Sequence, residues 1–415
     1  MPTAISKSPH LPSRRAFAPG LLSLFAPALL AGRGQPDVTI KVGGLFSLTG
    51  NSSDLGTQSK LMLSIAANDL QPMLEFYNAN PPAGSIGVAF ELLIEDTKLD
   101  PQTAANAATT LIGKGVQFLI GPQTSSEVAA VKPITDQHRV VLVSQGSTAS
   151  SLSLPNDSVF RFVPDDTLES KAAAQAAASV GIKAIVPVWR GDDGNRGLVS
   201  SLKTFASQFQ LTVAAGYEYA ITVTDFTSVA ASLESAVSQL KSTYSLQQIA
   251  IYLAGFDEAA ALLTAASQTP DLGSVRWFAG DGITLSNAYL TAGVAPFAAA
   301  TQLLAPSIAL PSEAQPIIAP VLAAMAEAGV ASPTAFAFAA YDAVICATLA
   351  WLLAGDDKHN VAAILPQVAQ RYFGTTGWAL LNANGDRAIG DFQFFGIALR
   401  SGAYTWIPVL TQQVS

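Results

Sequence analysis

Short apolar runs rich in β-branched residues alternate with longer helix-forming segments along most of the chain. Each run ends in a stretch of Gly, Ser, Thr, Asn or Asp, which is typical of a strand that leads into a loop. The pattern predicts strands at residues 38–46, 89–95, 116–120, 140–144, 184–189, 212–215, 248–253 and 275–279. It predicts helices between them, including residues 56–77, residues 101–112 with Asp100 as the cap, and one from Glu127.

The alternation of strands and helices predicts an α/β fold with parallel sheets covered on both faces. Right-handed crossovers then bring the strand-to-helix loops to one edge of each sheet, where ligands bind. The loops at that edge are small and polar: residues 47–53, 121–126, 144–148, 190–194, 255–258 and 280–282. Hydroxyls and N–H groups beside helix N-termini suit an anion, and an opposing carboxylate would suit a cation, as in an amino acid. The same residue types also cap helices and form turns, so each loop alone leaves that interpretation open.

Two apolar segments need separate interpretation. Residues 16–31 carry no charge and follow Lys7, Arg14 and Arg15, which predicts an export signal; residues 13–17 resemble the start of a twin-arginine signal. The alternative is a disordered or weakly anchored N-terminus. Residues 335–354 are long enough to cross a membrane, but their many Ala residues and Asp342 favour a buried core helix. We therefore expect a soluble protein that is periplasmic or secreted.

Composition narrows the function. The 415 residues include 22 Lys and Arg against 30 Asp and Glu, and this acidic balance argues against a nucleic-acid partner. The chain has one Cys and three scattered His, so neither an internal disulfide nor a Cys or His metal site is expected. It lacks a nucleophile elbow, a phosphate loop, a dinucleotide fingerprint after the first strand and an H-E-x-x-H motif. We expect neither an enzyme nor a cofactor.

The order of the motifs resembles the type I periplasmic binding proteins, in particular the leucine/isoleucine/valine-binding family. The resemblance covers nearly all of the chain after Asp37. It rests on residues 94–96, 100–104, 121–126, 143–148, 160–166, 224–226, 341–343 and 384–386. It implies two Rossmann-like α/β lobes, joined by three hinge strands, that close on a ligand. It implies an export signal and N-terminal segment at 1–36, lobe one at 38–158 plus 305–378, and lobe two at 159–304 plus 379–415.

The resemblance also implies ligand contacts. Ser125 matches the hydroxyl that holds the ligand carboxylate, and Asp281 matches the acidic residue that meets the ligand ammonium. The other implied contacts lie in the loops of the same edge: Gly146 through its backbone, then Ser147, Thr148 and Phe256. Leu55 and Gly194 stand where the family often has aromatic walls, so a wider pocket is expected.

These observations predict an exported, monomeric solute-binding protein without a metal or cofactor. It would capture an amino acid, amide or carboxylate in the cleft between the lobes and deliver it to an ABC permease. An alternative is a sensing domain that signals to a separate receptor or regulator. An exported hydrolase is a third possibility, which the absence of a visible nucleophile and base disfavours.

Overall fold

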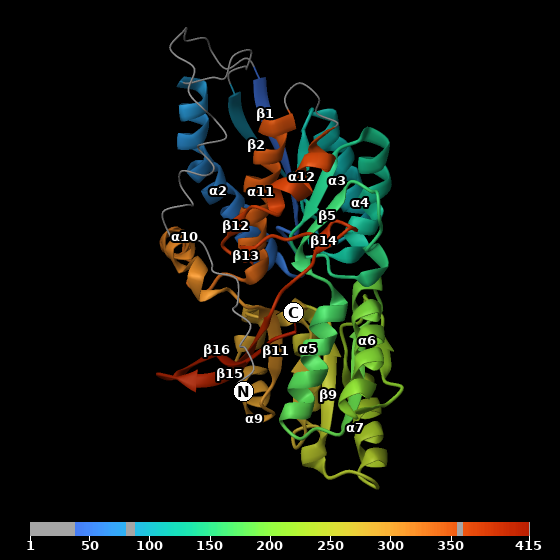
Figure 1. The fold of residues 1–415 in the computed structure, drawn as a ribbon. Helices are drawn as coiled ribbons and strands as arrows, with labels where there is room; N and C mark the ends of the chain where they lie inside the picture. The colour runs from blue at the N-terminus through green and yellow to red at the C-terminus, as the bar shows by residue number, and fades with distance from the viewer. Residues whose placement is uncertain (1–37, 80–87, 355–359, 415) are drawn as a thin grey trace, which may run out of the picture.

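The computed structural model describes residues 38–79, 88–354 and 360–414. Each of its two stacked lobes consists of a sheet with helices packed against it (Figure 1). The export signal predicted at residues 1–36 lies outside the described residues.

The first lobe contains a six-stranded sheet in which all neighbouring strands are parallel. In spatial order its strands are β14 (Asp386–Arg387), β5 (Val159–Pro164), β4 (Val141–Ser144), β3 (Phe118–Ile120), β1 (Val38–Phe46) and β2 (Val88–Asp96). Helices α3 (Pro101–Gly113) and α4 (Ser125–His138) pack on one face, burying aliphatic side chains against the strands. The other face is covered by α2 (Ser53–Ala79), α10 (Gln315–Glu327), α11 (Ala335–Ala354) and α12 (Val361–Ala369). This arrangement confirms the predicted parallel sheet with helices on both faces.

Local sequence signals explain where these helices begin. The Asp100 side chain accepts a hydrogen bond from the Thr103 backbone N–H at 2.7 Å, which confirms its predicted role as the cap of α3. Helix α4 begins at Ser125, two residues before the predicted start. The reason is a capping box, in which Thr124 and Glu127 each satisfy the other's backbone N–H.

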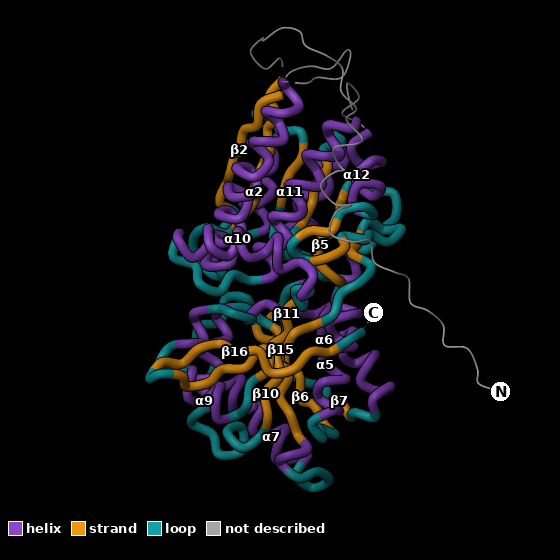
Figure 2. Tube along the Cα trace, turned by 60° about the vertical axis from the view of Figure 1, so that its left-hand side comes forward, coloured by secondary structure: helices purple, strands orange, loops and turns teal. Residues whose placement is uncertain are grey.

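The second lobe contains a larger, mixed sheet. Its main path runs β16 (Ala403–Gln412), β15 (Phe392–Arg400), β11 (Leu304–Ile308), β10 (Arg276–Ala279), β9 (Ile249–Ala254), β6 (Ala184–Arg190) and β7 (Thr212–Val213), with β8 (Tyr217–Tyr219) beside β6. The pairs from β7 to β11 are parallel, as predicted, whereas β15 and β16 form an antiparallel hairpin that was not predicted. Figure 2 shows this hairpin crossing the second lobe. A separate antiparallel pair links β12 (Phe373–Gly374) with β13 (Gly377–Trp378).

Helices again cover both faces of the second sheet. Helices α5 (Asp166–Ser179) and α6 (Asp193–Ala206) bury Ala, Leu and Val side chains on one face. On the other face lie α7 (Thr227–Leu240), α8 (Ala260–Ala266) and α9 (Ala295–Ala300).

Helix α11 is the only described helix that is long and apolar enough to cross a membrane, yet 78% of its most apolar window is buried inside the protein. This burial confirms the predicted core helix. The Asp342 carboxylate is satisfied there by the Tyr372 hydroxyl and by the backbone N–H groups of Thr375 and Thr376, at 2.8–3.0 Å. Cys346 is fully buried in the same helix.

The lobe boundaries inferred from the family resemblance remain a proposal. Strand pairing places β5 and β14 in the first sheet and β11 in the second. By that criterion the chain crosses between the lobes after residues 164, 308 and 387, which lie four to nine residues beyond the boundaries given above at 158, 304 and 378.

Candidate functional site

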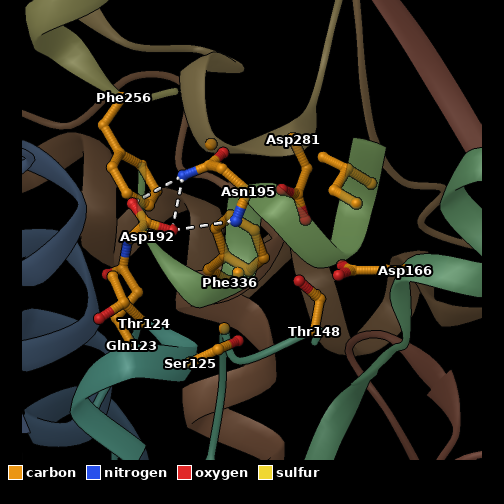
Figure 3. Close-up of a pocket in the computed structure, with 14 residues that line it drawn as sticks. Gln123, Thr124, Ser125, Thr148, Asp166, Asp192, Asn195, Phe256, Asp281 and Phe336 are labelled. Carbon is orange, nitrogen blue, oxygen red and sulfur yellow. Dashed lines mark hydrogen bonds between the residues drawn. The ribbon is translucent and has the colours of Figure 1, made fainter. Parts of the chain in front are cut away.

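A cavity lies between the lobes, where loops from the carboxyl ends of strands in both sheets meet (Figure 3). It encloses about 480 Å³ of empty space, part of which is its open mouth. The first lobe contributes Gln123, Thr124, Ser125, Gly146, Thr148 and Phe336; the second contributes Asp166, Asp192, Gly194, Asn195, Leu198, Phe256, Asp281 and Gly282. These lining residues include neither Lys, Arg nor His.

The wall from the first lobe is neutral and internally hydrogen-bonded. The Ser125 hydroxyl, at the first position of α4, lies 3.1 Å from the Ser147 hydroxyl and accepts from the Ala149 N–H at 3.1 Å. The Ser144 hydroxyl accepts from the N–H groups of Gly146 and Ser147. A side chain at Gly146 would place its Cβ 2.8 Å from Gln123 Cγ, so this close approach requires glycine.

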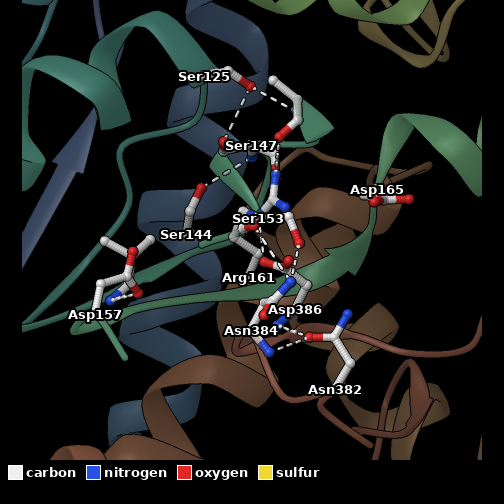
Figure 4. Close-up of polar contacts among 12 residues, drawn as sticks. Ser125, Ser144, Ser147, Ser153, Asp157, Arg161, Asp165, Asn382, Asn384 and Asp386 are labelled. Atoms are coloured by element: carbon white, nitrogen blue, oxygen red, sulfur yellow. Dashed lines mark hydrogen bonds and ion pairs between the residues drawn. The ribbon is translucent and has the colours of Figure 1, made fainter. Parts of the chain in front are cut away.

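A buried ion pair stabilises this wall from behind (Figure 4). Arg161, on β5, pairs with Asp386, on β14, and both side chains are almost fully buried. Arg161 Nη1 also donates to the Ala149 carbonyl at 2.6 Å and to the Ser147 carbonyl at 3.5 Å. The ligand-facing loop after β4 is therefore tied to the strands beside the inter-lobe crossings.

The start of helix α6 brings the second lobe close to Ser125. Asp192 caps this helix by accepting from the Asn195 backbone N–H at 2.9 Å, and it also accepts from the Asn195 side-chain amide. Gly194 follows, and a Cβ built there would lie 3.6 Å from the Ser125 Oγ. Any side chain longer than a methyl group at position 194 would therefore project into the space in front of Ser125.

Three carboxyl groups gather at another part of the second-lobe wall. Asp166 and Asp281 line the cavity, and Glu169 lies behind them, accepting from the Asp281 backbone N–H at 3.1 Å. Asp166 and Glu169 are each only 1% exposed. Burial raises the pKa of Asp166 to about 8 and that of Asp281 to about 6. Burial and the charges of the two Asp residues raise the pKa of Glu169 well above its usual range.

Two aromatic rings line the cavity from opposite lobes. Phe256 follows β9, and its carbonyl accepts from the Tyr289 hydroxyl at 2.9 Å, while the Arg190 guanidinium lies 5.3 Å from its ring centre. Phe336 lies in the first turn of α11. The expectation of a wider pocket did not take the Phe336 ring into account. The sequence analysis interpreted the segment that contains Phe336 only as a core helix.

Most residues predicted to contact the ligand do line the cavity: Ser125, Gly146, Thr148, Gly194, Phe256 and Asp281. Two do not. Ser147 is fully buried behind Ser125, and Leu55 is 1% exposed within the first turn of α2. Sequence reasoning missed Asp166, Asn195, Leu198 and Phe336. For Asp166 a signal existed, since it lies in the 160–166 motif directly after a strand, at the edge where ligands bind.

Among the hydrogen bonds that join the lobes in the described part of the chain, three run between loops beside the cavity, and we call these three the inter-lobe bridge. The Asn51 side-chain amide donates to Glu258 at 2.7 Å, and the Ser52 backbone N–H donates to Asp257 at 3.0 Å. The Asn287 side-chain amide donates to Asp54 at 2.8 Å. The lobes therefore contact each other directly, in a closed arrangement.

The arrangement offers hydroxyls and a helix N-terminus on one wall and carboxyl groups on the other. Among the residues that the structure describes, no group of three or more His, Cys, Asp or Glu has a geometry that could hold a metal ion. Walls of this kind can accept polar groups of opposite character at the two sides of the cavity.

Comparison with known proteins identifies the class. The model of the Periplasmic binding protein family matches residues 39–395, so the chain belongs to this family, whose members bind solutes and are not enzymes. The chain is 29% identical over 180 residues to an uncharacterized protein of Methanocaldococcus jannaschii, covering 41% of this chain and 42% of that protein. It is 28% identical over 152 residues to Glutamate receptor 2.1 of Arabidopsis thaliana, covering 36% and 16%.

A third relative is the Leu/Ile/Val-binding protein BraC3 of Rhizobium johnstonii, 26% identical over 154 residues that cover 37% of this chain and 39% of that protein. The chain thus aligns with less than half the length of each of these relatives.

Solved structures show the same fold. The leucine-binding protein LivK of Thermotoga maritima has a TM-score of 0.73 at 21% identity, covering 90% of this chain and 99% of that one. The protein LivJ of Streptococcus pneumoniae, in complex with isoleucine, gives 0.71 at 21% identity and 90% and 100% coverage. A solute-binding protein of R. palustris, in complex with 4-hydroxybenzoate, gives 0.72 at 15% identity and 91% and 98% coverage. Within the class, this chain is a type I periplasmic binding protein that is structurally similar to the Leu/Ile/Val-binding proteins of ABC transporters.

Proposed function

We propose that this protein is an exported solute-binding protein that captures a small polar ligand between its lobes and delivers it to an ABC permease. One observation carries the proposal: residues of both lobes line one cavity, so a ligand there contacts both walls only when the lobes are closed. Such a ligand stabilises the closed form, because the open form cannot make the same set of contacts.

The ligand class that we propose is an amino acid, an amide or a carboxylate. The similar structures hold an amino acid in one case and an aromatic carboxylate in another. Ser125, Gly146 and Thr148 would receive the carboxylate of such a ligand, and Asp281 would meet an ammonium group. Phe256 and Phe336 would contact the apolar part.

A second candidate function is ligand sensing, in which the closed form signals to a receptor or regulator. The similarity to a glutamate receptor favours it, because part of this chain matches part of a receptor. Deletion of the gene separates the two functions. Loss of uptake of the ligand supports delivery to a permease, whereas unchanged uptake with a lost transcriptional or motility response supports sensing.

A thermal-shift screen of the mature protein tests whether it binds a solute of this class. The panel contains amino acids, aromatic and aliphatic acids, amides and urea derivatives. A ligand present at about 100 times its dissociation constant adds roughly 2.7 kcal/mol to the free energy of unfolding. We expect at least one member to raise the melting temperature. A matched Gly194→Trp variant, whose ring would fill the space before Ser125, should lose that response. A panel without any response contradicts the proposal.

A further inference from the structure

Asn195, in the first turn of helix α6, carries a side-chain amide whose two ends differ in their hydrogen bonds. The residue lines the cavity and is 6% exposed. Its side-chain nitrogen donates to both carboxylate oxygens of Asp192, at 3.0 Å to Oδ1 and 2.9 Å to Oδ2 (Figure 3). The amide carbonyl oxygen makes no hydrogen bond with any residue that the structure describes.

The orientation of this amide is fixed by its neighbours. An ionised carboxylate only accepts hydrogen bonds, so the nitrogen of the amide, and not its oxygen, must face Asp192. Asp192 is itself held in place, because it accepts from the Asn195 backbone N–H at 2.9 Å and forms an ion pair with Arg190 at 2.8 Å. Asn195 therefore offers a ligand a hydrogen-bond acceptor but no donor, since both N–H groups of the amide are already taken.

The structure leaves room beside Asn195 for part of a ligand. A Cβ built at Gly194 would lie 3.6 Å from the nearest atoms of Asp192 and Ser125, so the glycine keeps this space open. A cation is not called for here, because Arg190 already neutralises Asp192. An acceptor that loses its water when the lobes close, without gaining a donor, costs free energy. A ligand enclosed at this place binds best if it supplies that donor.

We propose that Asn195 is a specificity-determining residue and that the ligand carries a neutral hydrogen-bond donor, a hydroxyl or a carboxamide, that binds the Asn195 carbonyl oxygen. This inference rests on the proposed function and narrows its ligand class to solutes with a polar side group. The donor is an additional group of the ligand, separate from the contacts proposed at Ser125 and Asp281. A purely aliphatic or unsubstituted aromatic side group leaves the carbonyl oxygen without a partner in the closed form.

Pairs of compounds with nearly the same shape test the need for this donor. Isothermal titration calorimetry would compare L-leucine with L-asparagine, L-valine with L-threonine, and benzoate with 4-hydroxybenzoate. The first compound of each pair is apolar where the second carries a donor. We expect the second compound of at least one pair to bind about ten times more tightly than the first, or better, because a site that must hydrogen-bond its ligand rejects the analogue lacking the donor.

The inference is overturned if no donor-bearing compound shows this preference. Solute binding still stands in that case, provided that any compound of the thermal-shift panel raises the melting temperature. A panel without any response contradicts the inference and the proposed function together. The two can therefore fail separately.

The variant Asn195→Ala assigns the preference to the amide. It keeps the backbone N–H that Asp192 accepts, so α6 should begin at the same residue. We expect the donor-bearing compound to lose about tenfold in affinity while its apolar partner changes little, so that the preference disappears. The same substitution at the exposed Asn106, in α3 of the first lobe, should leave both affinities as in the parent.

A merely structural role for Asn195 predicts a different result. The variant would then weaken both compounds of a pair equally, and such equal weakening contradicts the assignment. Circular dichroism would check that Asn195→Ala and Asn106→Ala fold. If Asn195→Ala does not fold, the comparison of the ligand pairs on the parent protein still decides whether the ligand needs the donor.

Discussion

The two walls of the cleft differ in how their charges are balanced. On the first-lobe wall, the Ser125 hydroxyl already has two partners, and Arg161 holds the loop behind it through two carbonyls. On the second-lobe wall, Asp166 and Glu169 each keep a buried oxygen atom without a hydrogen-bond partner among the described residues. Behind the first wall, Arg161 Nη2 and Asp386 Oδ2 also lack a hydrogen-bond partner, but these two side chains neutralise each other as an ion pair. The carboxyl groups of the second wall face no Lys, Arg or His among the residues that line the cavity. The difference indicates that the first lobe mainly sets the shape of the cavity, whereas the second lobe sets its selectivity for charge.

The largest expected effect comes from removing the ion pair that braces the first wall. Arg161→Met leaves Asp386 buried without its partner and frees two carbonyls, so we expect the free energy of unfolding to fall by about 3–5 kcal/mol. Urea denaturation would measure it, with the exposed Arg371→Met as a matched control. If Arg161→Met lowers the free energy of unfolding no more than the control does, the ion pair of Arg161 with Asp386 does not stabilise this wall.

The next effect falls on the charged wall. Asp281→Asn keeps the shape of the side chain but removes the charge, so binding of an amine ligand should weaken by about 2–5 kcal/mol. The melting temperature of the ligand-free protein should not fall at neutral pH, because the amide can still hydrogen-bond with Glu169 and removes a buried carboxylate whose charged form is disfavoured there. Calorimetry and thermal denaturation measure the two quantities. Unchanged affinity would mean that the ligand carries no ammonium at this position.

The charged wall should also make the ligand-free protein less stable as the pH rises. The folded-state pKa values of Asp166 and Asp281, about 8 and about 6, lie above the ordinary value of 3.8. Their contribution to stability is therefore fully present below pH 3.8 and is lost as the pH rises through 6 and then 8. Between pH 6 and 8 we expect the free energy of unfolding to fall by on the order of 2–3 kcal/mol.

Denaturation of the ligand-free protein at several pH values would measure this slope. Asp166→Asn should flatten it, because the amide does not titrate. If the free energy of unfolding of the parent protein stays constant from pH 6 to 8, the electrostatic difference between the two walls is contradicted.

The smallest effect should come from the neutral wall. Ser125→Ala removes one hydrogen bond to the ligand carboxylate, which should weaken binding by about 1–3 kcal/mol. Calorimetry measures the affinity, with the neighbouring Ser126→Ala as the control. Unchanged affinity would place the carboxylate elsewhere in the cavity.

Sequence reasoning predicted the features that depend on local signals. The strand at residues 38–46 has the predicted bounds, and Asp100 caps its helix because the cap and the helix adjoin in the chain. The C-terminal hairpin was missed, and Phe336 was interpreted only as part of a core helix. Which residues meet across the cleft depends on how two lobes approach each other, and no local pattern of residues encodes that. Asp166 and Gly194 come to face first-lobe residues only because the two lobes approach each other.

The inter-lobe bridge has a kinetic consequence. Its three bonds, from Asn51, Ser52 and Asn287, join protein to protein and involve none of the residues that line the cavity. The lobes separate only after the bridge breaks, so a trapped solute departs in two successive steps, opening and then escape. Solutes that the cavity holds weakly would share the first step and leave at a common limiting rate. Stopped-flow measurements on several solutes would show this common limiting rate of dissociation. The Asn51→Ala variant would raise the limiting rate equally for all of them.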